Sequence, residues 1–158
     1  MKHRLITQLI ELTQTNLQSA FDAAKSTYDI ATNEESKAEN KYDTRGLEAS
    51  YLAGAQAERV ADIKATLASY ENMQIKNFDE GAKIAISALI EISCQDKTSL
   101  VLLMPKGGGQ TMTFENRQIQ VITPESPLGK NLIGKEVGDS VVITTGNKTR
   151  EYEINSIS

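Results

Sequence analysis

Residues 34–51, EESKAENKYDTRGLEASY, decide how the N-terminal half of the chain folds. Long helical patterns lie on both sides of this stretch, and Gly46 within it is the first glycine of the chain. A glycine can end a helix in the left-handed conformation at little cost. Alternatively, Asp43 or Thr44 can cap the next helix by accepting hydrogen bonds from its free backbone N–H groups. In both cases the sequence predicts a polar turn, with a second helix resuming at about Leu47.

Charged side chains of one sign recur every four residues in this stretch. The two stripes are Glu35, Glu39 and Asp43, and Lys37, Lys41 and Arg45. Like charges four residues apart lie on one face of a helix and are mildly destabilising, by ~0.2–0.5 kcal/mol each. The pattern therefore indicates either a tip that meets a charged partner or a solvated helix end.

Before the turn, residues 2 to about 42 read as one long helix, because no Pro or Gly interrupts them and helix-forming residues are plentiful. Apolar residues recur at spacings of three and four, as in a coiled coil. Leu5, Leu9 and Leu12 begin the stripe, which resumes from Leu17, so we expect a stutter in the repeat between Leu12 and Leu17.

After the turn, a second stripe runs from Leu47 and Tyr51 through Val60 and Ile63 towards Met73. Two long helical patterns joined by a short polar break predict an antiparallel coiled-coil hairpin over residues 1–78, with its tip near residues 43–48. Each arm would be ~45–60 Å long at 1.5 Å per residue. Since such a hairpin buries little surface for its length, we expect a second domain at its base.

Residues 79–158 change to the two-residue period of β-strands. Alternation begins at Ile84, Ile86 and Ala88, and further short strands follow, separated by turn residues. Ser126 and Pro127 predict the start of one short helix that Gly134 can end. Gly146 and Asn147 predict a hairpin turn between the last two strands. The C-terminal half is thus expected to be an antiparallel sheet with one helix packed on it.

Composition argues against several functional classes. A net charge of −4 over 158 residues excludes general electrostatic nucleic-acid binding. Cys94 is the only cysteine, which excludes an internal disulfide or a cysteine-built zinc site and fits a reducing cytoplasm. His3 is the only histidine, so a Ser-His-Asp set would have to use the N-terminus. No apolar run could span a bilayer, and we expect a cytoplasmic protein without a membrane partner.

The C-terminal sequence VITPESPLGKNLIGKEVGDSVVI, followed by REYEINSI, resembles the Gre family of bacterial transcript-cleavage factors. The shared features are a Ser-Pro, a short helix ending in Leu-Ile-Gly-Lys, a Gly-Asp turn and a closing Glu-aromatic-Glu-Ile strand. Here they are Ser126-Pro127, Leu132-Ile133-Gly134-Lys135, Gly138-Asp139 and Glu151-Tyr152-Glu153-Ile154. The second hairpin helix is similar in character, so the resemblance covers nearly the whole chain.

The resemblance implies an α+β fold, in which an antiparallel coiled-coil hairpin precedes an FKBP-like sheet domain. It implies docking of that domain on the rim of the secondary channel of RNA polymerase, with the hairpin entering the channel. In the family, an Asp and a Glu at the tip help to hold a second Mg²⁺ at the polymerase active site, and polymerase then hydrolyses backtracked RNA. We expect a monomer that is no enzyme alone, has no cofactor of its own, and meets nucleic acid only within the elongation complex.

The tip acids of this chain are displaced from the family positions. Counted back from Tyr51, those positions fall on Thr44 and Leu47, whereas this chain has Asp43 and Glu48. The resemblance implies that Asp43 and Glu48 share the Mg²⁺ of polymerase. The alternatives are a helix cap for Asp43 and a first-turn acid, favoured by the helix dipole, for Glu48.

Between the two acids, Arg45 and Gly46 complete the tip. Arg45 could pair with Glu48 or meet RNA or an active-site acid. Because of the displaced acids, two further functions stay open: a regulator that occupies the channel and inhibits polymerase without cleavage, and a coiled-coil adaptor for another partner.

The resemblance also implies a polymerase-docking region near residues 126–135. Its candidate residues are Ser126, Pro127, Leu132, Ile133, Gly134 and Lys135. An FKBP-like domain raises prolyl isomerase activity as another possibility, but Phe114 and Tyr152 are the only aromatic residues after Phe78 that could line such a pocket. Residues 106–109, KGGG, lack the spacing of a P-loop and are expected to form a hairpin connection.

Overall fold

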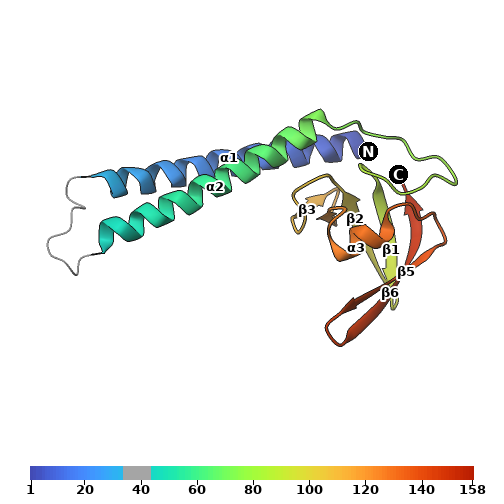
Figure 1. Ribbon diagram of the computed structural model, residues 1–158. Helices are drawn as coiled ribbons and strands as arrows, with labels where there is room; N and C mark the ends of the chain where they lie inside the picture. Colours follow the sequence, from blue (N-terminus) through green and yellow to red (C-terminus); the bar gives the residue numbers. More distant parts are fainter. Residues whose placement is uncertain (34–43) are drawn as a thin grey trace. The chain divides into compact units, whose positions relative to one another are not determined.

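The computed structural model describes residues 1–33 and 44–158, and shows two long helices followed by a sheet with one short helix (Figure 1). The elements are α1 (Lys2–Thr32), α2 (Arg45–Asn72), β1 (Leu89–Cys94), β2 (Lys97–Leu103), β3 (Thr111–Phe114), β4 (Arg117–Ile122), α3 (Pro127–Leu132), β5 (Ser140–Thr145) and β6 (Lys148–Ile157). This order confirms the expected α+β fold class.

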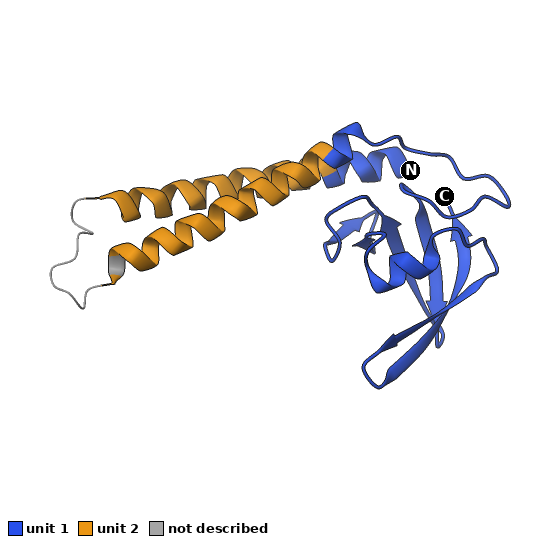
Figure 2. Cartoon of the chain, in the orientation of Figure 1, with its two compact units in different colours: residues 1–9, 69–158 blue, residues 10–68 orange. Residues whose placement is uncertain are grey.

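The chain forms two compact units, shown in Figure 2. One unit comprises residues 10–68, which are most of the two long helices, and the other comprises residues 1–9 and 69–158. The ends of both helices therefore belong to the unit that contains the sheet, whereas the sequence suggested a division after residue 78.

The described part of the turn between the helices differs from the expected one. α1 ends at Thr32, and the expected continuation to about residue 42 lies outside the described residues from residue 34 onward. α2 begins at Arg45, two residues before the expected start at Leu47. Gly46 therefore lies in the first turn of α2, and its prediction as a helix end is wrong. Thr44 stands immediately before α2, at the capping position that was the alternative.

The seam of the hairpin contains the predicted stutter, because its positions Leu5, Leu9, Thr13 and Leu17 follow one another in successive steps of four residues. The less exposed positions of α1 follow a three-and-four spacing through Leu9, Thr13, Leu17, Ala20, Ala24, Thr27 and Ala31. Those of α2 follow it through Gly46, Ala49, Ala53, Gln56, Val60, Ile63 and Leu67. Thr13 is 1% exposed and Leu12 is 38% exposed, so a threonine occupies the seam where hydrophobicity alone favoured leucine.

The six strands form one sheet in the order β3-β4-β2-β1-β6-β5. Four neighbouring pairs are antiparallel and β2 with β4 is parallel, so the sheet is mixed and not wholly antiparallel as expected. The parallel pair arises because the chain crosses from β2 to the edge strand β3 and returns in β4 beside β2. Residues 106–109 lie in this crossover, and their prediction as a hairpin connection is wrong.

Two tight hairpin turns contain no glycine. The β1–β2 turn has Gln95 and Asp96 at φ 47° and 63°, and the β3–β4 turn has Glu115 and Asn116 at φ 47° and 62°. Positive φ at both central residues is the geometry of a type I′ turn, whose twist matches that of the strands. Asn and Asp tolerate this conformation better than most residues, which allows the hairpins to close tightly.

The predicted strand at residues 84–88 is wrong, because β1 begins only at Leu89. The alternation arises from two other contacts. Ile84 exchanges backbone hydrogen bonds with the segment after α3, donating to the carbonyl of Lys135 (2.8 Å). Ser87 is fully buried at φ 74°, and its hydroxyl accepts the backbone N–H of Lys76 (2.8 Å). Residues 84–88 are therefore an irregular connection that is fixed at both ends.

One hydrophobic core lies between α3 and the sheet. Its buried members are Ile84, Ala88, Ile90, Ile92, Val101, Leu103, Ile122, Leu132, Val141 and Ile154. Val101 and Leu103 point to this face, so the alternating Leu100 and Leu102 point to the opposite one. These two leucines are also buried, which means that both faces of this part of the sheet are covered.

Hydrogen bonds join the ends of the long helices to β3 and to the loops before and after it. Arg4 donates to a carboxylate oxygen of Glu115 (3.4 Å), and Gln8 donates to the carbonyl of Thr113 (3.1 Å). The hydroxyl of Tyr70, which is 2% exposed, donates to the carbonyl of Lys106 (2.9 Å). Leu5, Ile6 and Leu9 are fully buried in the same unit.

Candidate functional site

At the start of α2, a threonine holds the carboxylate of an exposed glutamate. The hydroxyl of Thr44 donates to Oε1 of Glu48 (2.8 Å), and the backbone N–H of Glu48 donates to the carbonyl of Thr44 (2.9 Å). Glu48 lies in the first turn of the helix, where the dipole favours a negative charge by ~0.3–1 kcal/mol. Thr44 therefore fixes Glu48 from the position to which the sequence assigned the family's first acid.

Of the other predicted tip residues, the structure describes Arg45 and Gly46 but not Asp43. Asp43 lies outside the described residues, so its proposed metal and capping roles stay predictions. Arg45 and Gly46 are the first two residues of α2. Leu47, at the family's second acid position, is exposed. Within residues 1–33 and 44–158, no group of three or more His, Cys, Asp or Glu side chains could hold a metal ion.

Ser126 and Gly129 fix the start of α3. Ser126 is the N-cap, as predicted: its Oγ accepts the N–H of Gly129 (3.1 Å) and donates to the carbonyl of Thr123 (2.7 Å). A Cβ at Gly129 would lie 2.0 Å from that carbonyl oxygen, so only glycine fits. Pro127 occupies the first helical position, where no backbone N–H is needed.

The six candidate docking residues divide by exposure into two groups. Leu132 is fully buried in the core, and the side chain of Ser126 is used by the cap. Pro127, Ile133, Gly134 and Lys135 are exposed, Ile133 to 43%. Val137, which the sequence placed in a turn and not among the docking candidates, is 53% exposed in the loop that follows.

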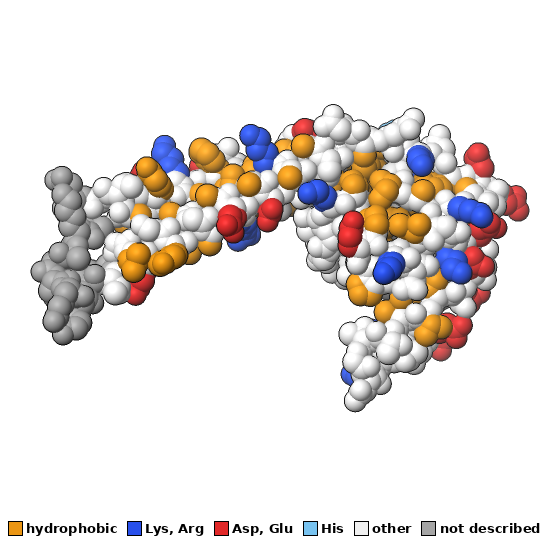
Figure 3. Space-filling model, in the orientation of Figure 1, with side chains coloured by type: hydrophobic (Ala, Val, Ile, Leu, Met, Phe, Trp, Pro, Cys, Tyr) orange, Lys and Arg blue, Asp and Glu red, His pale blue; other side chains and the backbone are white. Residues whose placement is uncertain are grey.

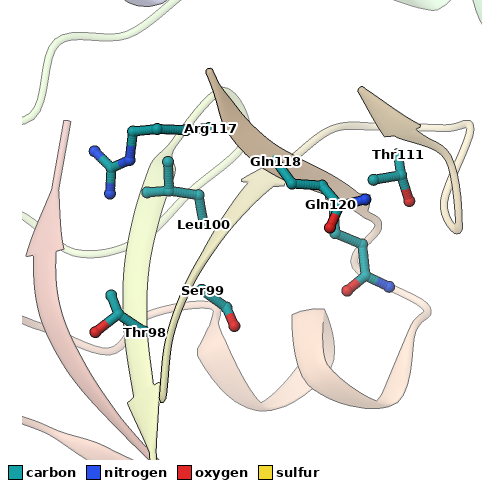
Figure 4. A pocket seen from close by; sticks show the side chains of 7 residues that line it. All are labelled: Thr98, Ser99, Leu100, Thr111, Arg117, Gln118 and Gln120. Carbon is teal, nitrogen blue, oxygen red and sulfur yellow. The ribbon is translucent and has the colours of Figure 1, made fainter. Parts of the chain in front are cut away.

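A shallow pocket of about 410 Å³ lies on β2, β3 and β4. Figure 4 shows the seven side chains that line it. They are Thr98, Ser99, Leu100, Thr111, Arg117, Gln118 and Gln120. Arg117 is the one ionisable residue among them, and it donates to a carboxylate oxygen of Glu91 (2.6 Å). The hydroxyl and amide groups of this lining are suited to hydrogen bonding with a polar ligand.

The aromatic residues and the cysteine that the sequence singled out lie in or beside the folded core and the strands. Phe114 is buried and Tyr152 packs against the core, and neither lines the pocket on β2–β4. Cys94 is half-buried at the end of β1, and its thiol is free. No helix within residues 1–33 and 44–158 is both long enough and apolar enough to cross a membrane.

Residues 110–158 match the family model described as "Transcription elongation factor, GreA/GreB, C-term". These residues comprise β3 to β6 and the whole segment on which the resemblance was based.

Curated relatives extend the match beyond this segment. "Transcription elongation factor GreA" of Methylococcus capsulatus is 30% identical over 99 residues, which are 63% of this chain and 60% of that protein. The GreA of Thermodesulfovibrio yellowstonii is 29% identical over 154 residues, covering 96% of this chain and 86% of its own. The matches confirm the resemblance to the Gre family of transcription elongation factors.

Solved structures include "GreA factor homolog 1 (Gfh1) protein of Thermus thermophilus", with 22% identity and a TM-score of 0.39 over 98% of this chain and 93% of that one. Another is a "Prokaryotic transcription elongation factor GreA/GreB from Nitrosomonas europaea", with 16% identity and a TM-score of 0.37 over 75% and 95% of the two chains.

Proposed function

We propose that this chain is a transcription elongation factor that binds RNA polymerase through the secondary channel and promotes cleavage of backtracked RNA. The family match of residues 110–158 and the GreA relatives support the first part of this proposal. The observation that carries the second part is the Glu48 carboxylate, exposed in the first turn of α2 and held by Thr44.

Glu48 suits the role of a shared metal ligand. A carboxylate offers about four acceptor positions, so the single bond from Thr44 leaves others for an ion. Carboxylate oxygens are the protein ligands that Mg²⁺ prefers, and a second Mg²⁺ in polymerase would activate water and stabilise the charge of the hydrolytic transition state. Glu48 would contribute a ligand, and Thr44 would limit the rotamers of that side chain. The active site itself would belong to polymerase, so the chain would not act as an enzyme alone.

The exposed segment around α3 is the proposed docking surface on the rim of the channel. Ile133 and Val137 are apolar and exposed, and Lys135 lies between them. An apolar centre with a positive charge beside it suits a partner surface with apolar and acidic side chains. Ser126 and Leu132 would act only indirectly, by holding this segment in place.

A second candidate function is occupancy of the channel without cleavage. It is favoured by one observation: the positions where the family pattern has acids hold Thr44 and the exposed Leu47. An apolar side chain cannot bind Mg²⁺, so the metal would depend on acids displaced from those positions.

Cleavage of RNA in a stalled, backtracked elongation complex with Mg²⁺ tests the two candidates. The wild type, Asp43→Ala, Glu48→Ala and Thr44→Val would be compared at several Mg²⁺ concentrations. We expect Glu48→Ala and Asp43→Ala to abolish stimulation, and Thr44→Val to require more Mg²⁺ for the same rate. Glu58→Ala, which removes an exposed acid of α2 away from the tip, is the matched control and should behave as the wild type.

Binding to core polymerase, measured in parallel, separates the candidates. Binding of the wild type without cleavage supports the channel-occupying regulator, and absence of binding refutes both candidates. Ile133→Asp should weaken binding about tenfold or more, since it places a charge in an apolar contact. Val142→Asp, a similarly exposed position on β5, is its control.

A further inference from the structure

The tip-proximal half of the hairpin carries an apolar groove of about 630 Å³ that runs along both helices. It lies wholly within the unit of residues 10–68. Its floor is made of small residues, including Ala24, Ala53, Gly54 and Ala57. Figure 3 shows apolar side chains exposed along this hairpin. Such a surface suits an apolar occupant.

The same groove has large aromatic residues at its border. Phe21 and Tyr28 line it and are 53% and 62% exposed. One face therefore presents both projecting rings and a hollow of alanine and glycine into which such rings fit. A surface that carries knobs and holes together can pair with a copy of itself around a two-fold axis.

Charge supports an antiparallel pairing of two such faces. Lys25 lines the groove and also the adjacent shallow hollow on α1, which Asp22 and Asp29 line as well. The two acids stand three residues before and four residues after Lys25. In an antiparallel arrangement whose two-fold axis lies level with Thr27, Lys25 of each copy faces Asp29 of the other. A parallel arrangement in register would place the two lysines opposite each other, which is unfavourable.

We propose that two copies of this chain associate through this groove, with their α1 helices antiparallel and the rings of each copy in the hollow of the other. Burying Phe21 and Tyr28 on both copies removes on the order of 400–500 Å² of aromatic surface. Such an interface falls below about 1,200 Å² and belongs to the weak, transient class. The pair is therefore reversible, with a Kd in the micromolar range or weaker.

Pairing would cover the tip-proximal half of each hairpin, so the paired form could not insert that half into a narrow channel. The monomer would be the active form and the pair a reservoir. The proposal goes beyond the function proposed above and stands without it, since self-association can be measured in the absence of polymerase.

Sedimentation velocity of the full chain, from about micromolar to several hundred micromolar, tests the pairing. The decisive variant is Gly54→Leu, which fills the hollow. A Cβ at Gly54 has no atom of the chain within 4 Å, and leucine favours a helix more than glycine, so the variant should fold. The matched control is Ala55→Leu, which adds a side chain at an exposed neighbouring position outside the groove. Circular dichroism would confirm the helix content of both.

We expect the wild type and Ala55→Leu to shift from monomer towards dimer as concentration rises, and Gly54→Leu to associate at least about tenfold more weakly. Lys25→Glu should also weaken association, and adding Asp22→Lys and Asp29→Lys to it should restore association, because every charge is then reversed. A wild type that stays monomeric overturns the proposal and leaves the groove to a helix of another protein. Equal association of Gly54→Leu and wild type overturns it too, and failure of the triple reversal refutes the antiparallel arrangement.

Discussion

Gly129→Ala tests the close packing at the start of α3. The added Cβ would lie 2.0 Å from the carbonyl oxygen of Thr123, and real Cβ contacts essentially never fall under 3.0 Å. Either α3 or the Thr123 backbone must therefore move. The movement also disturbs the bond from the N–H of Gly129 to Ser126 Oγ, which is 3.1 Å long.

Two effects add to the expected loss. Overpacking costs about 1–3 kcal/mol and a lost N-cap about 1 kcal/mol, which gives roughly 2–4 kcal/mol for the free energy of unfolding. For a chain of 158 residues, each kcal/mol lowers the Tm by about 2–4 °C, so a fall of roughly 10 °C is expected.

Calorimetry and urea unfolding of the full chain would measure the effect. Gly54→Ala is the matched control: a Cβ there has no neighbour within 4 Å, and alanine stabilises a helix by up to about 1 kcal/mol relative to glycine. A free energy of unfolding for Gly129→Ala within about 0.5 kcal/mol of the wild type would refute the close approach. In that case the close approach of Gly129 to Thr123 would not be what holds α3, and the proposed docking segment that continues from it, in place.

Three further predictions concern the sheet unit. Tyr70→Phe should lower the free energy of unfolding by about 1–3 kcal/mol, because it leaves the carbonyl of Lys106 without its hydroxyl donor; urea unfolding measures this. Burial raises the pKa of Tyr70 to about 12, from an ordinary value of 10.0. Because folding favours the neutral phenol, Tyr70 stabilises the folded state fully below its unfolded pKa of about 10, and this contribution is lost as the pH rises towards 12. The free energy of unfolding of the wild type should therefore fall between about pH 10 and pH 12. The same fall in Tyr70→Phe would contradict this assignment. Leu132→Ala should cost about 2–5 kcal/mol, whereas Ile133→Ala, at a position that is 43% exposed, should cost under about 1 kcal/mol; equal losses by calorimetry would show that the two residues are wrongly assigned to core and surface.

Local signals in the sequence predicted much of the fold. Long uninterrupted helical periods indicated the hairpin, and Ser126-Pro127 indicated α3, because a cap and a first-position proline act through neighbouring residues. The glycine-free turns at Gln95-Asp96 and Glu115-Asn116 lack the usual turn dipeptide, so the lengths of the flanking strands were harder to predict.

The errors came from partners distant in sequence. The parallel pairing of β2 with β4 depends on a crossover that strand periodicity does not encode. Residues 84–88 alternate like a strand, but they are fixed by Lys76 and Lys135, which lie outside that segment. At the tip, the sequence indicated Glu48 as a candidate, whereas the hydrogen bond from Thr44 to Glu48 depends on α2 beginning at Arg45 and not at Leu47.

The composition of the hairpin seam implies a gradient of local stability along its length. Beyond Leu17 and Val60, the less exposed positions hold only alanine, threonine, glycine and glutamine, and Oε1 of Gln56 is buried without a hydrogen-bond partner among the described residues. Each such layer removes less apolar surface from water than a leucine layer does. Amide protons of this half should therefore exchange with solvent through local fraying, faster than those beside Leu9 and Leu67, while the sheet stays folded. A seam of small residues keeps the two helices close together, but it lets the tip-proximal ends of the helices unfold locally at a low free energy. A partner that binds these ends would therefore also increase the fraction of time for which they are helical.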